Sequence, residues 1–435
     1  MANDRGLESP ISGRDYGLVA YRAASDLLSR IAMLVLTVVA ARRLSPAAFG
    51  VLTLGSTLGW LGAVASDAGM QMHLGRSVAR RPHAMWPLLR RWLKARAATS
   101  GLVLGLLVAG LLALDVSLPH QQALLLLTCG YLVTGLVELV HYAFRGVART
   151  DLESTISASQ RLVTLVLGVA VLFWRADVVL LSAAMLVAPV AALVWSLAAA
   201  RRIAASDPEI SVASTDKTAR SVWREFGRDV APIGLGIVLS ALYFRIDTFL
   251  IGLWHDTVAV GLYGAVFRIV DALRLFPAAA LAVALPALCR ATSLRTVAAM
   301  AVPLTLAAGL AGAALAAVAA WLVPALYGPA FAAAVPAFRI LLVAFPLMCL
   351  NYALTQQLIG WNGQRTFAAL SAVALVVNLG VNAWLIPSLA IVGAAWATLA
   401  TEVVLTAGCA VALAAGRRGS GLDPSPVQAA AWQEG

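Results

Sequence analysis

The feature that most constrains this chain is the recurrence of apolar runs along nearly its whole length. A helical run of about 20 residues, rising about 1.5 Å per residue, is long enough to cross the ~30 Å hydrocarbon layer of a membrane. Hydrophobic residues make up 61% of the 435 residues and charged residues 12%, which is too apolar for an ordinary water-soluble fold. We therefore predict an all-α integral membrane protein with about twelve transmembrane helices. The expected crossings are residues 18–41, 47–66, 97–114, 122–142, 156–174, 178–200, 230–254, 259–286, 297–323, 337–359, 366–386 and 392–414.

The positive charge of the chain, +11 in net terms, is distributed as in a membrane protein. Most Lys and Arg residues fall in alternate connections between the apolar runs, such as 76–96 and 201–228. This bias marks the cytoplasmic side, so we expect a multi-pass protein of the inner (cytoplasmic) membrane with both termini in the cytoplasm. No basic domain is formed, and we expect no nucleic-acid partner. Residues 1–16 lack a small-residue cleavage site, so we do not expect a secretory signal there.

A long polar stretch at 201–229 divides the expected crossings into six and six. Residues 45–52 and 256–263 resemble each other, and each stretch follows the first crossing of its half. Six helices per half favours two parallel repeats related by a pseudo-two-fold axis along the membrane normal. The expected parts are a cytoplasmic N-terminal tail (1–16), an N-lobe of helices 1–6 (17–200), a cytoplasmic linker (201–229), a C-lobe of helices 7–12 (230–414) and a cytoplasmic C-terminal tail (415–435).

Charged residues inside the expected crossings are the strongest functional signal, because a central Arg or Asp costs roughly 2.5–3.5 kcal/mol in lipid. In the first crossing, Arg22, Ser25, Asp26, Ser29 and Arg30 share one helical face. Arg22 fits equally well a side chain that reaches back to the inner surface. Arg30 lies too deep for that, which favours a polar cavity with Asp26 as its partner.

The seventh and eighth expected crossings carry a second group of charges, Arg245, Asp247, Arg268, Asp271 and Arg274. One interpretation is an internal salt-bridge network that fixes the register of the helices. However, Arg outnumbers Asp two to one in the first and the eighth crossing. Guanidinium groups in a polar cavity bind phosphate oxygens in bidentate fashion, so we expect a site for a phosphate or pyrophosphate group. Its candidate ligands are Arg22, Arg30, Arg245, Arg268 and Arg274, with Asp26, Asp247 and Asp271 as cavity carboxylates.

The remaining intramembrane polar residues leave two interpretations open. Glu402 suits a proton or cation site, or equally a neutral carboxyl group bonded to a neighbour. Several amides are candidate sugar contacts, although hydrogen bonds between helices are their commoner role. These amides belong to Asn351, Gln356, Gln357, Asn378 and Asn382.

The sequence lacks the motifs of an ATPase, a metalloenzyme or a serine hydrolase. The expected outer connections are also too short for the domain that a membrane glycosyltransferase or polymerase needs. We therefore expect no enzymatic activity, no cofactor and no metal site.

Four stretches together resemble the polysaccharide transporter family, the flippases of lipid-linked oligosaccharides typified by O-antigen translocases. They are ARRLSPAAFGVLTL (41–54), RIDTFLIGLWHDTVAVGLYGAVFRI (245–269), LYGPAFAAAVPAFRILL (326–342) and NLGVNAWLIPSLAIVGAAWAT (378–398). One departure is Ala390, where the family often has Gly, and it bears on loop geometry. The resemblance implies two six-helix lobes around a cavity that opens alternately to each face, with a lateral gap beside the first and eighth helices for a lipid tail.

From the charges and the resemblance we predict a flippase for a polyprenyl-pyrophosphate-linked oligosaccharide in surface polysaccharide biosynthesis. A monomer would be the transport unit, embedded in membrane lipid, with a polysaccharide polymerase and glycosyltransferases as expected partners. A cation-coupled multidrug antiporter of the same superfamily is the main alternative, which would favour carboxylates and aromatic surfaces in the cavity. A lipid II type flippase and a non-transporting scaffold are further alternatives.

Overall fold

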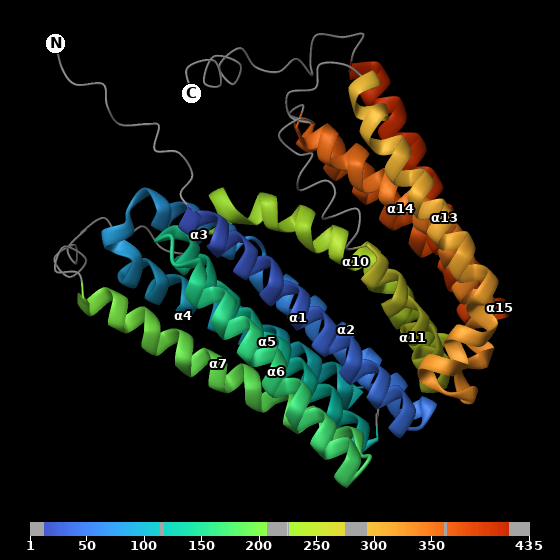
Figure 1. The fold of residues 1–435 in the computed structure, drawn as a ribbon, viewed down its shortest axis with the longest axis horizontal. Coiled ribbons are helices and arrows are strands. Elements are labelled where there is room, and N and C mark those ends of the chain that lie inside the picture. Colours follow the sequence, from blue (N-terminus) through green and yellow to red (C-terminus); the bar gives the residue numbers. More distant parts are fainter. Residues whose placement is uncertain are drawn as a thin grey trace. The chain divides into compact units, whose positions relative to one another are not determined.

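The computed structural model describes residues 13–113, 117–206, 224, 226–274, 294–360 and 363–416, and this part of the chain is helical without a strand (Figure 1). The helices before the linker are α1 (Gly13–Arg43), α2 (Pro46–Asp67), α3 (Met70–Arg80), the 3-10 turn η1 (Pro82–Ala84), α4 (Met85–Ala113), α5 (Leu118–Gly146), α6 (Thr150–Trp174) and α7 (Val178–Ser206). Those after it are the π-turn η2 (Phe226–Val230), α10 (Ala231–Trp254), α11 (Thr257–Leu273), α13 (Leu294–Tyr327), the 3-10 turn η3 (Pro329–Ala334), α14 (Val335–Gly360) and α15 (Gln364–Gly416). The predicted all-α class is confirmed.

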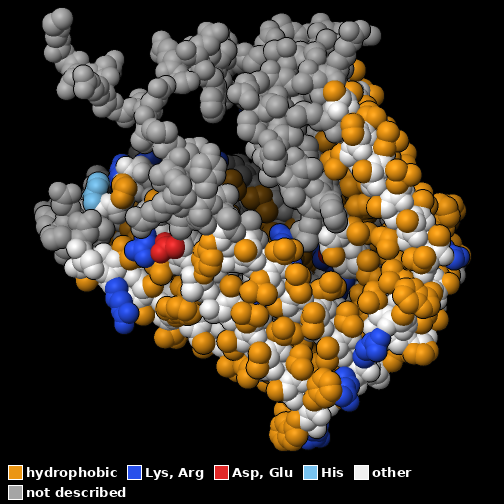
Figure 2. All heavy atoms as spheres, in the orientation of Figure 1, with side chains coloured by type: hydrophobic (Ala, Val, Ile, Leu, Met, Phe, Trp, Pro, Cys, Tyr) orange, Lys and Arg blue, Asp and Glu red, His pale blue; other side chains and the backbone are white. Residues whose placement is uncertain are grey.

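The surface of these helices is that of a protein embedded in lipid. Within the described ranges, ten helices are long and apolar enough to cross a membrane. Large apolar side chains point outward from several of them, with Leu106 65%, Val166 64% and Leu310 74% exposed. Figure 2 shows a face on which hydrophobic side chains predominate and charged ones are few. Exposure of this kind is costly in water, so the predicted location in a membrane is confirmed. The count of twelve crossings and the pseudo-two-fold symmetry stay predictions.

The described residues form two compact units, which divide between Ala241 and Leu242. The division falls inside α10, whereas the sequence suggested a boundary in the linker at 201–229. Residues 207–223 of that linker, residues 1–12 of the N-terminal tail and residues 417–435 of the C-terminal tail lie outside the described residues. The predicted lobe boundaries therefore stay predictions. The unit before the division is called the N-unit below, and the other the C-unit.

Helix α5 is the centre of the N-unit, where it packs against α2, α3, α4, α6 and α7. Small residues allow this close approach. A Cβ at Gly55 of α2 would lie 2.6 Å from the Leu127 side chain of α5, and one at Gly59 would lie 2.7 Å from the ring of Tyr131. Packing around small residues is how helices associate in lipid, where the hydrophobic effect between helices is absent. These glycines therefore set the spacing of α2 and α5.

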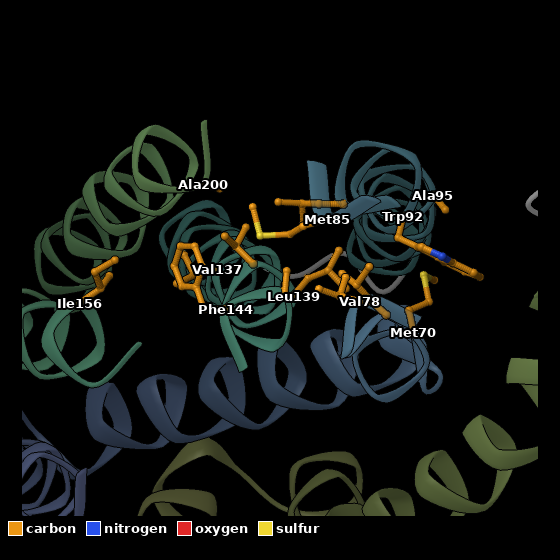
Figure 3. Close-up of a cluster of buried hydrophobic side chains, with 14 of the residues drawn as sticks. Met70, Val78, Met85, Trp92, Ala95, Val137, Leu139, Phe144, Ile156 and Ala200 are labelled. Carbon is orange, nitrogen blue, oxygen red and sulfur yellow. The ribbon is translucent and has the colours of Figure 1, made fainter. Parts of the chain in front are cut away.

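One buried cluster ties five helices of the N-unit together (Figure 3). It contains Met70 of α3, Met85 and Trp92 of α4, Phe144 of α5 and Ala200 of α7, all without solvent exposure. These residues come from the ends of the helices that meet the basic connections. The cluster therefore fixes the end of the unit at which the basic connections lie.

In the C-unit, α14 packs between α13 and α15 and also contacts α11. Helix α15 is 53 residues long, with non-helical backbone at Ala390. Three pairs of residues show that it folds back on itself there. A Cβ at Gly393 would lie 2.5 Å from the carbonyl oxygen of Leu385, one at Gly408 would lie 2.6 Å from Leu370, and Asn378 donates to Thr401 at 3.2 Å. Helix α15 is thus a hairpin of two antiparallel arms.

The turn of this hairpin places Ala390 at φ 48° and ψ −127°, a region that glycine enters freely and that a Cβ disfavours. Strain of this kind costs of order 1–3 kcal/mol. We expect Ala390→Gly to stabilise the protein by about 1 kcal/mol or more, seen as a higher unfolding temperature in detergent. The matched control is Ala407→Gly, an exposed position in the regular part of the same helix, where the same change should destabilise by about 1 kcal/mol. Equal destabilisation by both substitutions would show that the turn is unstrained.

Candidate functional site

In the C-unit, the predicted charges of helices α10 and α11 form a compact ion-pair cluster. Arg245 of α10 contacts Asp271 of α11 with 2.5 Å between Nη2 and Oδ2. Arg274, which ends α11, approaches the other oxygen of the same carboxylate at 3.8 Å. These three side chains, called the arginine cluster below, are 22%, 28% and 33% exposed for Arg245, Asp271 and Arg274. Two guanidinium groups therefore share one carboxylate at a partly open position.

Aromatic rings hold both guanidinium groups of the arginine cluster in place. The Cζ atom of Arg274 lies 4.0 Å from the centroid of the Phe244 ring. That of Arg245 lies 4.8 Å from the Phe267 ring. Ring faces attract cations and leave the N–H groups at the edge of the guanidinium plane free to bind an acceptor. The cluster thus holds two positive charges near each other at a partly exposed position.

Arg268 and Asp247 lie on the same two helices but have other neighbours. Arg268 is half-buried on α11 and interacts electrostatically with Tyr327 of α13. Asp247 is buried; it accepts hydrogen bonds from the hydroxyl group of Tyr263 and from the backbone N–H of Thr248, the latter at 2.8 Å. The predicted site residues on α10 and α11 are three arginines and two aspartates. Cations therefore outnumber anions in this group.

The predicted coupling residue Glu402 is buried in a hydrogen-bonded group of four side chains. Its carboxylate accepts from the Tyr243 hydroxyl at 2.7 Å and from Nδ2 of Asn351 at 2.6 Å. The remaining amide oxygen of Asn351 accepts from Thr406 at 2.8 Å. The Asn351 amide is therefore fully used within the protein, which matches the commoner role foreseen for it.

The other candidate sugar contacts differ in what their amides bond to. Asn378 donates to Thr401 at 3.2 Å, and Asn382 donates to Asn378 at 2.8 Å. Gln357 is 1% exposed, and among the described residues neither its amide nitrogen nor its amide oxygen has a hydrogen-bond partner. Gln356, one residue before it, is half-buried. Gln357 is thus a fully buried amide for which this part of the chain offers no partner on either group.

In the N-unit, the charged face of α1 separates into two parts. Arg22 lies 3.7 Å from Glu153 of α6, a carboxylate that also receives two hydrogen bonds from Arg145, at 2.5 and 2.8 Å. Asp26 and Arg30 are exposed, and neither forms an ion pair with any residue that the structure describes. The expected partnership of Asp26 and Arg30 is therefore not formed here, and the Arg30 guanidinium is open to an external anion.

The sequence reasoning missed a buried ion pair between Asp67 and Arg96. Arg96 had been grouped with the basic residues of a connection, but it is 1% exposed and lies 2.8 Å from Asp67. It also donates to the carbonyl oxygen of Ala63 at 2.7 Å. Asp67 in turn accepts from the backbone N–H groups of Gly69 and Gln71, at 3.1 and 3.2 Å. The positions of the two residues could have indicated this ion pair. Asp67 ends one apolar run and Arg96 precedes the next, so both are expected at the same depth in the membrane.

The tyrosines that hold the buried carboxylates were also missed, although they lie on the same helices as the predicted charges. Tyr243 serves Glu402, and Tyr263 serves Asp247. No sequence pattern distinguishes a tyrosine that donates to a buried carboxylate from any other tyrosine in an apolar helix. The residues described contain no cluster of His, Cys, Asp or Glu suited to a metal ion.

Comparison with solved structures gives matches over nearly the whole chain. A lipid II flippase, MurJ, in an inward closed conformation has a TM-score of 0.62 at 9% identity, covering 90% of this chain and 87% of its own. A multidrug resistance MATE family transporter of the MOP superfamily, in an inward-facing conformation, also has a TM-score of 0.62, at 14% identity, covering 92% and 96%. A MOP superfamily transporter from Pyrococcus furiosus has a TM-score of 0.53 at 16% identity, covering 92% of each chain. At such identities the likeness concerns the fold.

A search of curated proteins found no match. A sequence model described as "Polysaccharide biosynthesis protein" matches residues 19–292. This stretch covers more than half of the chain and includes most of α1 and all of α10 and α11, the helices that carry the predicted charges. The fold seen in the solved structures is consistent with this match. This multi-pass membrane protein therefore belongs to the polysaccharide biosynthesis protein family.

Proposed function

We propose that this protein is a flippase that moves a polyprenyl-pyrophosphate-linked oligosaccharide from the cytoplasmic to the outer leaflet of the inner membrane by alternating access. Both termini would lie in the cytoplasm. The membership of the family and the fold shared with a lipid II flippase support transport of a lipid-linked substrate. A polysaccharide polymerase and glycosyltransferases would act on the same substrate, and one monomer would be the transport unit.

The observation that carries this proposal is the arginine cluster of Arg245, Asp271 and Arg274. Without substrate, Asp271 limits the repulsion between the two guanidinium groups. A pyrophosphate group brings more negative charge and more acceptor oxygens than one carboxylate, so it can take over both cations. Arg268, and Arg22 and Arg30 from the N-unit, are proposed as further ligands, with Asp26 and Asp247 as additional carboxylates of the path.

For the sugar part of the substrate, the amides are not equivalent. Gln357 has an amide without an internal partner, and an unbonded buried amide is costly. It is therefore our first candidate for a sugar contact, followed by Gln356 and by Asn382, whose amide oxygen is also without a partner in the described part of the chain. Asn351 and Asn378 would position Glu402 and the hairpin arms instead.

The test is transport by the full chain in vesicles with defined lipid-linked sugars, scoring which lipids change leaflet. We expect movement of a polyprenyl-pyrophosphate-linked oligosaccharide and no movement of the same glycan on a neutral lipid. The rival function, a cation-coupled multidrug antiporter, predicts drug efflux from the same vesicles and higher drug sensitivity of a deletion strain. Drug efflux without lipid movement would replace the proposal by its rival.

We further expect Glu402→Gln to remove the dependence of transport on an ion gradient. A buried carboxylate that accepts from Tyr243 and Asn351 can bind and release a proton or a small cation, whereas an amide cannot. Flipping should therefore become the same with and without the gradient. Initial rates under proton, sodium and no gradient give the measurement. The control is Glu138→Gln, an exposed carboxylate that accepts from Gln71 at 3.2 Å, which should leave the gradient response intact.

A further inference from the structure

A groove of about 1060 Å³ lies at the end of the N-unit that carries the basic connections. Helix α7 forms one wall through Trp195, Ala198 and Arg202. The turn between α5 and α6, residues 146–149, forms the other wall together with Leu152. The groove is separate from the arginine cluster, which belongs to the C-unit.

The α7 wall of this groove continues an apolar stripe. Val187, Val190 and Val194 are 53%, 44% and 64% exposed. Ala198 and Arg202 follow at the same helical spacing, so all five residues share one face of α7. The stripe therefore runs from the exposed apolar surface of the helix into the groove and ends at a cation. Trp195, 45% exposed, lies beside it, as tryptophan does at the headgroup level of membranes.

The polar end of the groove has an excess of positive charge. Arg202 is exposed and forms no ion pair with a residue in the described ranges. Arg149 on the opposite wall is held by Asp151 through two hydrogen bonds of 3.0 Å, which raise the pKa of Arg149 above its usual value. Arg201, next to Arg202, lies over the ring of Trp86 at 5.7 Å. An anion in the groove would meet the guanidinium groups of Arg149 and Arg202, which line it from opposite walls.

We propose that this groove binds an anionic phospholipid of the cytoplasmic leaflet, as a site distinct from that of the transported substrate. The phosphodiester group contacts Arg202, and an acyl chain follows Ala198, Val194 and Val190 along α7. Basic pockets between membrane helices on the cytoplasmic side suit such headgroups. The proposal uses the predicted orientation of the N-unit and does not depend on the transport activity.

The test measures how much phosphatidylglycerol the purified full-length protein retains in a neutral detergent, by native mass spectrometry, with phosphatidylcholine as the neutral reference. Arg202→Gln should lower the affinity for phosphatidylglycerol about fivefold, the effect of one basic side chain near a charged lipid. Asp151→Asn should raise it, because the change frees the guanidinium group of Arg149. The matched control is Arg175→Gln, since Arg175 is exposed at the other end of α6, and it should change nothing. Equal retention by Arg202→Gln and the unchanged protein would overturn the proposal.

A second variant separates a lipid from a free anion. Ala198→Trp fills the groove and keeps every charge, so it should abolish retention of phosphatidylglycerol while leaving the protein folded, because Ala198 is exposed. Soluble glycerol phosphate, offered at the same concentration, should not displace the lipid. Displacement by glycerol phosphate, or normal retention by Ala198→Trp, would show that the acyl chain does not lie in this groove and would refute the lipid assignment.

Discussion

Arg274→Gln is expected to stop transport of the lipid-linked oligosaccharide without lowering the abundance of the protein. A charge-assisted hydrogen bond is worth about 1.5–3 kcal/mol, so losing it weakens pyrophosphate binding roughly 10- to 100-fold. Stability should change little, because the Arg274 side chain is 33% exposed and lies 3.8 Å from Asp271, a long contact for an ion pair. Export of surface glycan by cells and flipping in vesicles give two independent measurements.

Two further variants make this expectation specific. Arg339→Gln removes an exposed arginine of the same unit that donates to a backbone carbonyl of α13, and it should transport normally. Asp271→Asn leaves both guanidinium groups without their shared carboxylate. It should bind the pyrophosphate more tightly and release it more slowly. Normal transport by Arg274→Gln would remove the arginine cluster from the substrate path.

Arg96→Met is expected to destabilise the protein more than a substitution of Arg274, Arg202 or Lys94. Removing one partner of a buried ion pair costs about 3–5 kcal/mol, because the other charge stays buried without compensation. Asp67, 14% exposed, would be left in that position. It would still accept from the N–H groups that begin α3, so the local turn should survive. The measurement is the unfolding temperature in detergent together with the amount of folded protein in the membrane.

Two control variants test whether the buried charge causes this loss of stability. One replaces another cation of α4, and the other adds a second substitution in the Asp67–Arg96 ion pair. Lys94→Gln alters an exposed cation two residues away, and we expect its effect to stay within about 0.5 kcal/mol. Adding Asp67→Asn to Arg96→Met removes the uncompensated charge and should restore much of the lost stability. If the double variant is as unstable as Arg96→Met alone, the loss comes from packing and not from the charge.

The sequence was sufficient for the helical membrane class because apolar runs and basic connections follow directly from the physics of the bilayer. It says less about where the helices end. The third crossing is expected from residue 97, and the helix that contains it, α4, begins at Met85. Hydropathy alone cannot detect this extension, since Arg90, Arg91 and Lys94 are polar residues with good helix propensity. The turn at Ala390 shows a different limit, because an alanine gives no signal for a positive φ.

For the candidate site, the sequence identified which charged residues are unusual but not which ones meet. The i, i+3 spacing brings Asp271 and Arg274 together on one helix. The contact between Arg245 and Asp271 joins two helices, and helical periodicity does not give the rotation of one helix against another. For the same reason, Asp26 could be assigned to Arg30 on spacing alone, although the two side chains do not pair. The assignment of substrate ligands remains a prediction for the experiments above.

The hairpin of α15 has a consequence for how this membrane protein is made. Asn378 and Thr401 are 23 residues apart and bond across its two arms. Because so short a loop closes quickly, the arms can meet as soon as both have left the ribosome. Their polar groups would then satisfy each other before entering lipid, where an unbonded amide is costly. We therefore expect the two arms to insert together as one unit, and Asn378→Leu to allow the first arm to insert alone.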